Sequence, residues 1–144
     1  MENRKQPIGF LVKQINNVFE KDLNKKLKTI GVTSSQCAVL DYLFHTNKDE
    51  VSQRDVEENL NLKNPTVTGL LKRLDEKGYI LCVPNAVDKR RKNIYLTEKA
   101  YDIQRRMDAD RKKLDKRLTR GMTKKEVAAV THALEKMLYN IADP

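Results

Sequence analysis

The sequence predicts a mainly α-helical chain with one small β-hairpin, in which short central helices and the hairpin are flanked by long helices at both ends. Two observations support this fold class. Apolar residues recur at helical spacing over most of the chain, and two short β-favouring runs enclose a charged stretch between residues 79 and 96. The 144 residues are enough for a single domain, 1–144, with a moderate core.

The N-terminal part of the chain predicts a long helix over about 7–30 and a shorter one after it. Gly31 is expected to close the first helix. Thr33, with Gln36 three residues later, forms the pattern of a capping box for the second. The inward positions are Ile8, Leu11, Val12, Ile15, Val18, Phe19, Leu23, Leu27 and Ile30 in the first helix, and Cys37, Val39, Leu40, Leu43 and Phe44 in the second.

A short central helix is predicted next, because Ser52 and Asp55 form another capping-box pattern. Val56 and Leu60 are its inward positions. Residues 61–63 then make a three-residue turn into the following helix. A helix, a short turn and a second helix are the parts of a helix-turn-helix, whose second helix enters the major groove of DNA.

The second helix of this pair is predicted over 65–77. Asn64 is expected to be its N-cap, Pro65 suits the first helical position, and Gly78 ends the helix. Small hydroxyl side chains near the start permit close approach to base edges, and cations a turn later suit phosphates. An ordinary surface helix with a polar outer face is the alternative. The inner face carries Val67, Leu70, Leu71 and Leu74, and the outer face Thr66, Thr68, Gly69, Lys72 and Arg73.

The charged stretch that follows is predicted to form the tip of a hairpin with strands at 79–83 and 93–96. A helix-turn-helix followed by such a hairpin is a winged helix-turn-helix. Arginine is the usual cation in a narrow minor groove, so Arg90 and Arg91 are candidates for contact there. Asp88 stands among four cations and is expected to hold an arginine in place, since DNA would repel it. The alternative is an ordinary solvated charged loop.

The excess positive charge is concentrated in one part of the chain. Residues 1–62 hold nine basic and nine acidic side chains, whereas residues 63–97 hold eight and three, and residues 98–120 hold nine and five. The whole excess of +9 therefore lies on the second helix of the pair, the hairpin and the helix after it. Binding to DNA phosphates by release of counterions requires a localised basic surface of this kind.

Two further helices are predicted after the hairpin, one over 98–120 and a last one that Thr123 and Glu126 would cap. The winged core then spans about 34–98, and dimerisation helices span about 7–30 and 98–142. These long helices carry more apolar surface than one small domain covers, so we expect a homodimer. A solvated arm is the alternative for 98–120. The apolar positions are Ile103, Met107, Leu114 and Leu118, then Val127, Val130, Leu134, Met137, Leu138 and Ile141.

The order of these elements resembles the MarR family of bacterial transcriptional regulators across nearly the whole chain. The resemblance implies that helix 65–77 lies in the major groove, that Arg90 enters the minor groove and that Asp88 braces it. It also implies a dimer joined through the first and last helices, with a crevice for an effector such as a phenolic or other lipophilic anion. The most specific matches are Asn64-Pro65-Thr66-Val67-Thr68, Leu71, Leu74 and Lys77-Gly78, followed by Asp88-x-Arg90 and Leu96-Thr97-Glu98-Lys99.

We therefore expect a ligand-responsive regulator, a repressor rather than an activator, that binds double-stranded DNA at a pseudo-palindromic operator. Thr66 and Thr68 would lie near base edges, and Lys72 and Arg73 on phosphates. A symmetric dimer would place its two recognition helices one DNA turn apart, about 34–36 Å. The residues expected to contact DNA are Ser52, Asn64, Pro65, Thr66, Thr68, Lys72, Arg73, Asp88, Arg90 and Arg91.

Other functions have weaker support in the sequence. No phosphate loop, nucleophile with a nearby base, paired carboxylates or metal-ligand spacing is present, so we expect no enzyme activity, no cofactor and no metal site. No apolar run approaches the roughly 18 residues that span a bilayer, and a cytoplasmic location is expected. Two alternatives remain open. Cys37, one turn into its helix, suits a redox-sensing regulator, and a winged helix can also bind protein or RNA.

Overall fold

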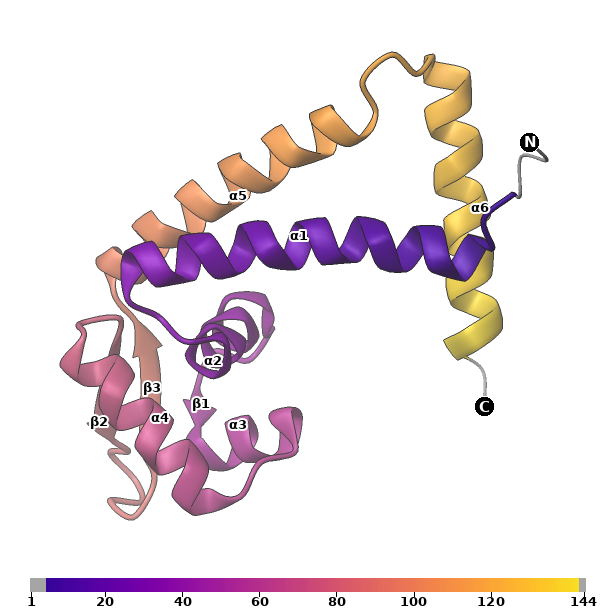
Figure 1. Cartoon of the computed structure of the whole chain (residues 1–144). Coiled ribbons are helices and arrows are strands. Elements are labelled where there is room, and N and C mark those ends of the chain that lie inside the picture. The colour runs from indigo at the N-terminus through magenta and orange to yellow at the C-terminus, as the bar shows by residue number, and fades with distance from the viewer. Residues whose placement is uncertain (1–4, 143–144) are drawn as a thin grey trace. The chain divides into compact units, whose positions relative to one another are not determined.

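The computed structural model describes residues 5–142 and is mainly helical, with one three-stranded antiparallel sheet (Figure 1). The chain divides into two compact units, the first ending at Arg105 and the second beginning at Arg106. No helix in residues 5–142 is long and apolar enough to cross a membrane. The elements are α1 (Ile8–Ile30), α2 (Ser34–His45), β1 (Val51–Ser52), α3 (Gln53–Leu60), α4 (Asn64–Glu76), β2 (Ile80–Pro84), β3 (Lys92–Leu96), α5 (Glu98–Leu118) and α6 (Lys124–Ala142).

The core of the first unit lies between α2, α3, α4 and the sheet, which contact one another (Figure 1). On α4 the predicted inner stripe is buried, and its Val67 and Leu74 are completely buried. Val39 of α2, Val56 of α3 and Ile80 of β2 are completely buried as well. The apolar periodicity of these short elements therefore identified the core correctly.

Three predicted capping boxes are confirmed, and they fix where α2, α3 and α6 begin. In each box the hydroxyl oxygen accepts the N–H three residues later, and the longer side chain accepts the N–H of the first residue. Each box therefore satisfies two backbone donors that the helix itself leaves without partners. The pairs are Thr33 with Gln36, Ser52 with Asp55, and Thr123 with Glu126.

The start of α4 differs from the prediction, and its end agrees. The N–H of Val67 donates to the Lys63 carbonyl at 3.1 Å, so the helix begins at Asn64 and Lys63 is the N-cap without a side-chain bond. The predicted N-cap role of Asn64 is therefore wrong. At the other end Gly78 has a φ of +81°, and the Tyr79 N–H donates to the Leu74 carbonyl at 3.0 Å. This is a Schellman ending, for which glycine is the preferred residue.

The predicted hairpin is confirmed, and the sheet contains one strand that was not predicted. β2 pairs with β3 in antiparallel register, with Ile80 opposite Leu96. β1 adds to the other side of β3, so the strand order is β1-β3-β2 and Val51 lies opposite Ile94. Since β1 has only two residues, it shows no alternation in the sequence that could predict it.

The terminal helices leave their apolar positions exposed. In α1 only Leu27 is buried, whereas Ile8 is 61% exposed and Ile15 is 43% exposed. In α6 no residue is buried, and Leu138 and Ile141 are 63% and 81% exposed. The helical stripes are where the sequence predicts them, and most of their apolar side chains are exposed.

Candidate nucleic-acid interface

The outer face of α4 presents the residues that the sequence singled out. Thr66 and Thr68 are exposed near its N-terminus, and Lys72 and Arg73 are exposed one to two turns later. The buried stripe fixes this orientation, because it turns the opposite face of the helix toward solvent. Hydroxyl donors therefore precede cations along one accessible helical face.

Gln53, the first residue of α3, joins the two helices of the helix-turn-helix. Its amide nitrogen donates to the hydroxyl oxygen of Thr68 at 2.8 Å and to the carbonyl of Asn64 at 3.5 Å. A carbonyl can only accept, so the amide nitrogen must face α4, and the Thr68 hydroxyl acts as the acceptor. The hydrogen of that hydroxyl is left to donate outward, which suits an acceptor atom on a base edge. No motif or spacing in the sequence points to this role of Gln53.

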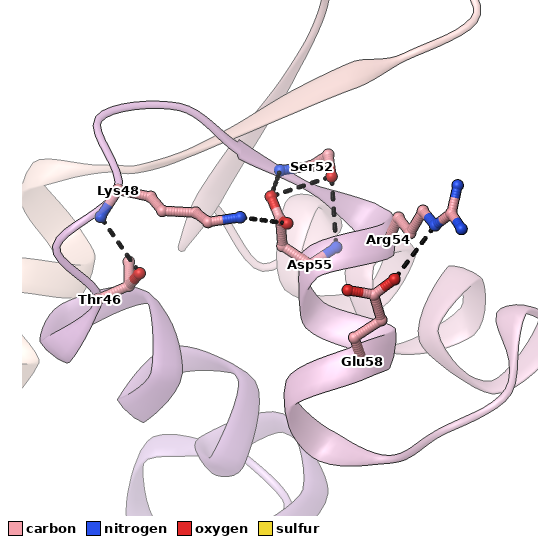
Figure 2. Close-up of polar contacts among 6 residues, drawn as sticks. All are labelled: Thr46, Lys48, Ser52, Arg54, Asp55 and Glu58. Carbon is pink, nitrogen blue, oxygen red and sulfur yellow. Dashed lines mark hydrogen bonds and ion pairs between the residues drawn. The ribbon is translucent and has the colours of Figure 1, made fainter.

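The N-terminus of α3 is held by a compact polar network (Figure 2). Asp55 accepts hydrogen bonds from the N–H of Ser52 at 2.9 Å, from its hydroxyl at 3.0 Å and from Nζ of Lys48 at 2.6 Å. The Ser52 hydroxyl in turn accepts the Asp55 N–H at 3.3 Å. The hydroxyl hydrogen of Ser52, a residue predicted to contact DNA, is engaged within the cap. Ser52 and Asp55 therefore orient α3 before any contact with DNA.

The Asp55 network predicts an acid-sensitive contribution to stability. The hydrogen bond from Lys48, followed by that from the Ser52 N–H, lowers the pKa of Asp55 below its ordinary value. The stabilisation is therefore present above the unfolded pKa of about 4 and is lost as the pH falls through the lowered pKa. We expect Asp55→Asn to lower the free energy of unfolding on the order of 1 kcal/mol at pH 7. Urea unfolding at a series of pH values measures this difference.

The control for this prediction is Asp49→Asn, which removes a neighbouring carboxylate that makes no ion pair within residues 5–142. It should change stability little at any pH. The difference between wild type and Asp55→Asn should shrink below about pH 4. A difference that stays constant down to pH 3 would show that the ionised carboxylate does not carry the effect.

Two turns stabilised by side chains shape the wing, defined here as residues 85–91. Asn85 Oδ1 accepts the N–H groups of Val87 at 2.9 Å and Asp88 at 3.1 Å. Asp88 Oδ1 accepts the N–H of Arg90 at 3.0 Å, and the Asn85 N–H donates to the Arg91 carbonyl at 2.8 Å. Asn and Asp commonly form such turns by bonding to backbone two residues on. The wing is therefore a shaped loop with exposed cations.

Asp88 acts on Arg90 differently from the expectation. Within residues 5–142 its carboxylate forms no ion pair with an arginine side chain, and it instead accepts the backbone N–H of Arg90. The Asp-x-Arg spacing suits an Asx turn, so Asp88 holds Arg90 through its backbone and not through its guanidinium. The guanidinium of Arg90 is left exposed at the tip.

Arg91 lies at the base of the wing beside the start of α3. It lines a polar cavity of about 380 Å³ together with Ser52, Asp55 and Asn85. Basic and acidic side chains both line this cavity, so its charge does not select an anion or a cation. Arg90 and Arg91 therefore occupy different surroundings, although they are adjacent in the sequence.

The two cysteines, Cys37 and Cys82, lie in α2 and β2 and are at least partly buried. Cys37 is buried in α2 with 8% of its surface exposed, and the two thiols are not joined in a disulfide. Burial raises the pKa of the Cys82 thiol, which disfavours the reactive thiolate. Among residues 5–142 no three His, Cys, Asp or Glu side chains lie close enough together to hold a metal ion.

Comparison with known proteins agrees with this geometry. A sequence profile described as "Transcriptional regulator SarA/Rot" matches residues 21–107, which include all of α2 to β3. The chain belongs to the SarA/Rot family. This family consists of MarR-like winged-helix regulators, so the family resemblance seen in the sequence is confirmed. It is a family of transcriptional regulators.

This SarA/Rot member is also similar to individual proteins over almost its full length. It is 30% identical over 131 residues to the uncharacterized HTH-type transcriptional regulator YwoH of Bacillus subtilis strain 168, covering 89% of this chain and 93% of YwoH. MepR, a transcription regulator of the Staphylococcus aureus multidrug efflux pump MepA, is 26% identical with a TM-score of 0.81, covering 94% and 99% of the two chains. A MepR–DNA complex of S. aureus gives 27% identity, a TM-score of 0.77 and coverage of 92% and 98%. The predicted winged-helix fold is confirmed, and the protein belongs to a family of transcriptional regulators.

Proposed function

We propose that this protein is a homodimeric, ligand-responsive repressor that binds a pseudo-palindromic operator. The observation that carries the proposal is the exposed outer face of α4 beside a wing with an exposed arginine tip. One element suits the major groove and the other suits the adjacent minor groove. As a regulator of operator DNA the protein would act in the cytoplasm, as expected from the sequence.

Each predicted contact has a place in this arrangement. Thr66 and Thr68 face base edges from the N-terminal half of α4, and Lys72 and Arg73 neutralise phosphates from its second half. Arg90 enters the minor groove. Around these residues, Ser52 and Asp88 shape the backbone through a cap and a turn, and Asn64, Pro65 and Arg91 border the interface.

The exposed apolar stripes support the homodimer. In α1, a helix of 23 residues, only Leu27 is buried, so its apolar face is left for contact with a second copy. Pairing with a second copy would cover such a face and would present two recognition helices to the two halves of a pseudo-palindrome. The stripe of α1 comprises Ile8, Leu11, Val12, Ile15, Val18 and Leu23, all of which are exposed.

The effector is proposed from the family resemblance and from charge. Residues 98–120 carry nine basic and five acidic side chains, so a phenolic or other lipophilic anion would meet a favourable field near α5. Redox sensing through Cys37 is not favoured by any observation, because that side chain is buried.

Salt dependence of binding tests the proposal. A gel-shift titration with the duplex upstream of the protein's own gene should show sequence-selective binding. Raising the salt from about 50 to 200 mM should weaken it about a thousandfold or more if six or more phosphates are neutralised. Lys72→Gln should lower the slope of log K against log salt by about one, because one phosphate contact is lost. A flat salt response, or tighter binding to RNA or a protein, would contradict the repressor proposal.

A further inference from the structure

The end of the recognition helix is tied to the end of α1 by a group of polar contacts that we call the α1–α4 joint. Its members come from parts of the chain more than 40 residues apart. All of them lie in the first compact unit. The joint comprises Ile30, Gly31, Gln36, Lys77 and Tyr79.

Lys77 is the centre of the joint. It is the half-buried C-cap residue of α4, and its ammonium group donates to the Gly31 carbonyl and to Oε1 of Gln36, the latter at 2.7 Å. Gln36 is 1% exposed, and the same oxygen accepts the Thr33 N–H that caps α2. The C-cap side chain of α4 therefore contacts both the C-cap residue of α1 and the first turn of α2.

Tyr79 adds a second link between the same elements. Its hydroxyl donates to the Ile30 carbonyl at 3.3 Å. Burial raises the pKa of Tyr79, so the hydroxyl keeps the proton that it donates. The last carbonyls of a helix lack partners within the helix. At the end of α1, the carbonyl of Ile30 accepts the hydroxyl of Tyr79, and the carbonyl of the C-cap residue Gly31 accepts the ammonium group of Lys77.

The other side of the joint is held by the start of α5. Lys99 donates to the Lys77 carbonyl, and its Nζ lies 4.6 Å from the centre of the Tyr79 ring. Thr97 donates its hydroxyl to the Gly78 carbonyl at 2.6 Å. The C-terminal end of α4 is thus fixed between α1 and α5, while its N-terminal half is left accessible.

We infer that Lys77 is a positioning residue, which sets the angle of the recognition helix to α1 and thereby the separation of the two recognition helices in the dimer. The inference rests on the proposed function, since α1 bears the apolar face assigned to dimerisation. Lys77 is the one basic residue of α4 and its C-cap whose ammonium is bonded to protein atoms within residues 5–142. A contact with DNA is therefore not its role, in contrast to Lys72.

The test compares Lys77→Met, which keeps the apolar stem and removes the ammonium group, with the matched variant Lys72→Met. Affinity is measured for the operator, for operators with one base pair added or removed between half-sites, and for unrelated DNA over a salt series. Lys77→Met should lose about tenfold in affinity for the natural spacing and should discriminate less between spacings. Its salt slope and its binding to unrelated DNA should match those of wild type. In Lys72→Met the slope of log K against log salt should fall by about one, and the preference for the natural half-site spacing should stay as in wild type.

Two results would overturn the inference. One is a wild-type spacing preference in Lys77→Met, and the other is a loss of about one unit of salt slope, which would make Lys77 a phosphate contact. Lys77→Arg keeps charged donors and should restore part of the spacing preference. If Lys77→Met fails to fold, Tyr79→Phe removes a single hydroxyl of the same joint, and a wild-type preference in that variant also overturns the inference. Absence of operator binding by the wild type would instead reject the proposed function, and the inference with it.

Discussion

Ile15→Asp is expected to convert the protein to a monomer and to weaken operator binding by about a hundredfold or more, because binding through two linked half-sites is lost. Ile15 lies in the exposed apolar stripe of α1 and is 43% exposed in the single chain. A carboxylate buried in a paired stripe would lack a partner and would oppose association. The core of the first unit does not include this side chain, so the monomer should stay folded.

The matched control is Asn17→Asp, which introduces a carboxylate two residues later, on the opposite side of the same helix. It should leave both the oligomeric state and operator affinity close to wild type. Analytical ultracentrifugation measures the mass, circular dichroism reports the helix content, and a gel shift measures binding. A dimer that persists in Ile15→Asp would place the interface outside the α1 stripe.

The sequence predicted the elements whose signal is local. Apolar spacing identified the inner face of α4, and three capping boxes located the starts of α2, α3 and α6. The N-cap predicted for α4 was wrong. The Lys63 carbonyl accepts the first hydrogen bond of the helix, so Asn64 is the first helical residue and not the N-cap. β1 was missed because two residues carry no periodic pattern.

The sequence predicted those site residues whose role depends only on the type of side chain and on the helical face that bears it. The outer face of α4 and the exposed arginine of the wing follow from such patterns. The roles of Gln53 and Lys77 depend on contacts with residues 15 and 41 positions away, and no spacing rule predicts a contact over that separation. Asp88 was recognised as a structural residue, but its bond to backbone was not distinguished from a bond to a guanidinium.

Arg90→Ala is expected to weaken specific operator binding by about 1–3 kcal/mol, or roughly 5- to 150-fold, with fold and dimer unchanged. The side chain is exposed at the wing tip, and Asp88 holds the Arg90 backbone through its N–H rather than through its side chain. Removing the guanidinium therefore breaks no hydrogen bond or ion pair within residues 5–142. Arg90→Lys should recover only part of the affinity, because an ammonium group cannot reproduce the planar donors of a guanidinium.

Variants of Lys89 and Asp88 distinguish a specific minor-groove contact of Arg90 from a general effect of positive charge on DNA binding. Lys89→Ala removes one exposed charge from the same loop and should cost less than Arg90→Ala if the guanidinium occupies the minor groove. Asp88→Ala frees the Arg90 N–H and should also weaken binding, but it should add little in the Arg90→Ala background, since it acts by placing Arg90. Equal losses of operator affinity in Lys89→Ala and Arg90→Ala would show that the wing contributes only its positive charge. Wild-type affinity in Arg90→Ala would show that the wing arginine takes no part in operator binding.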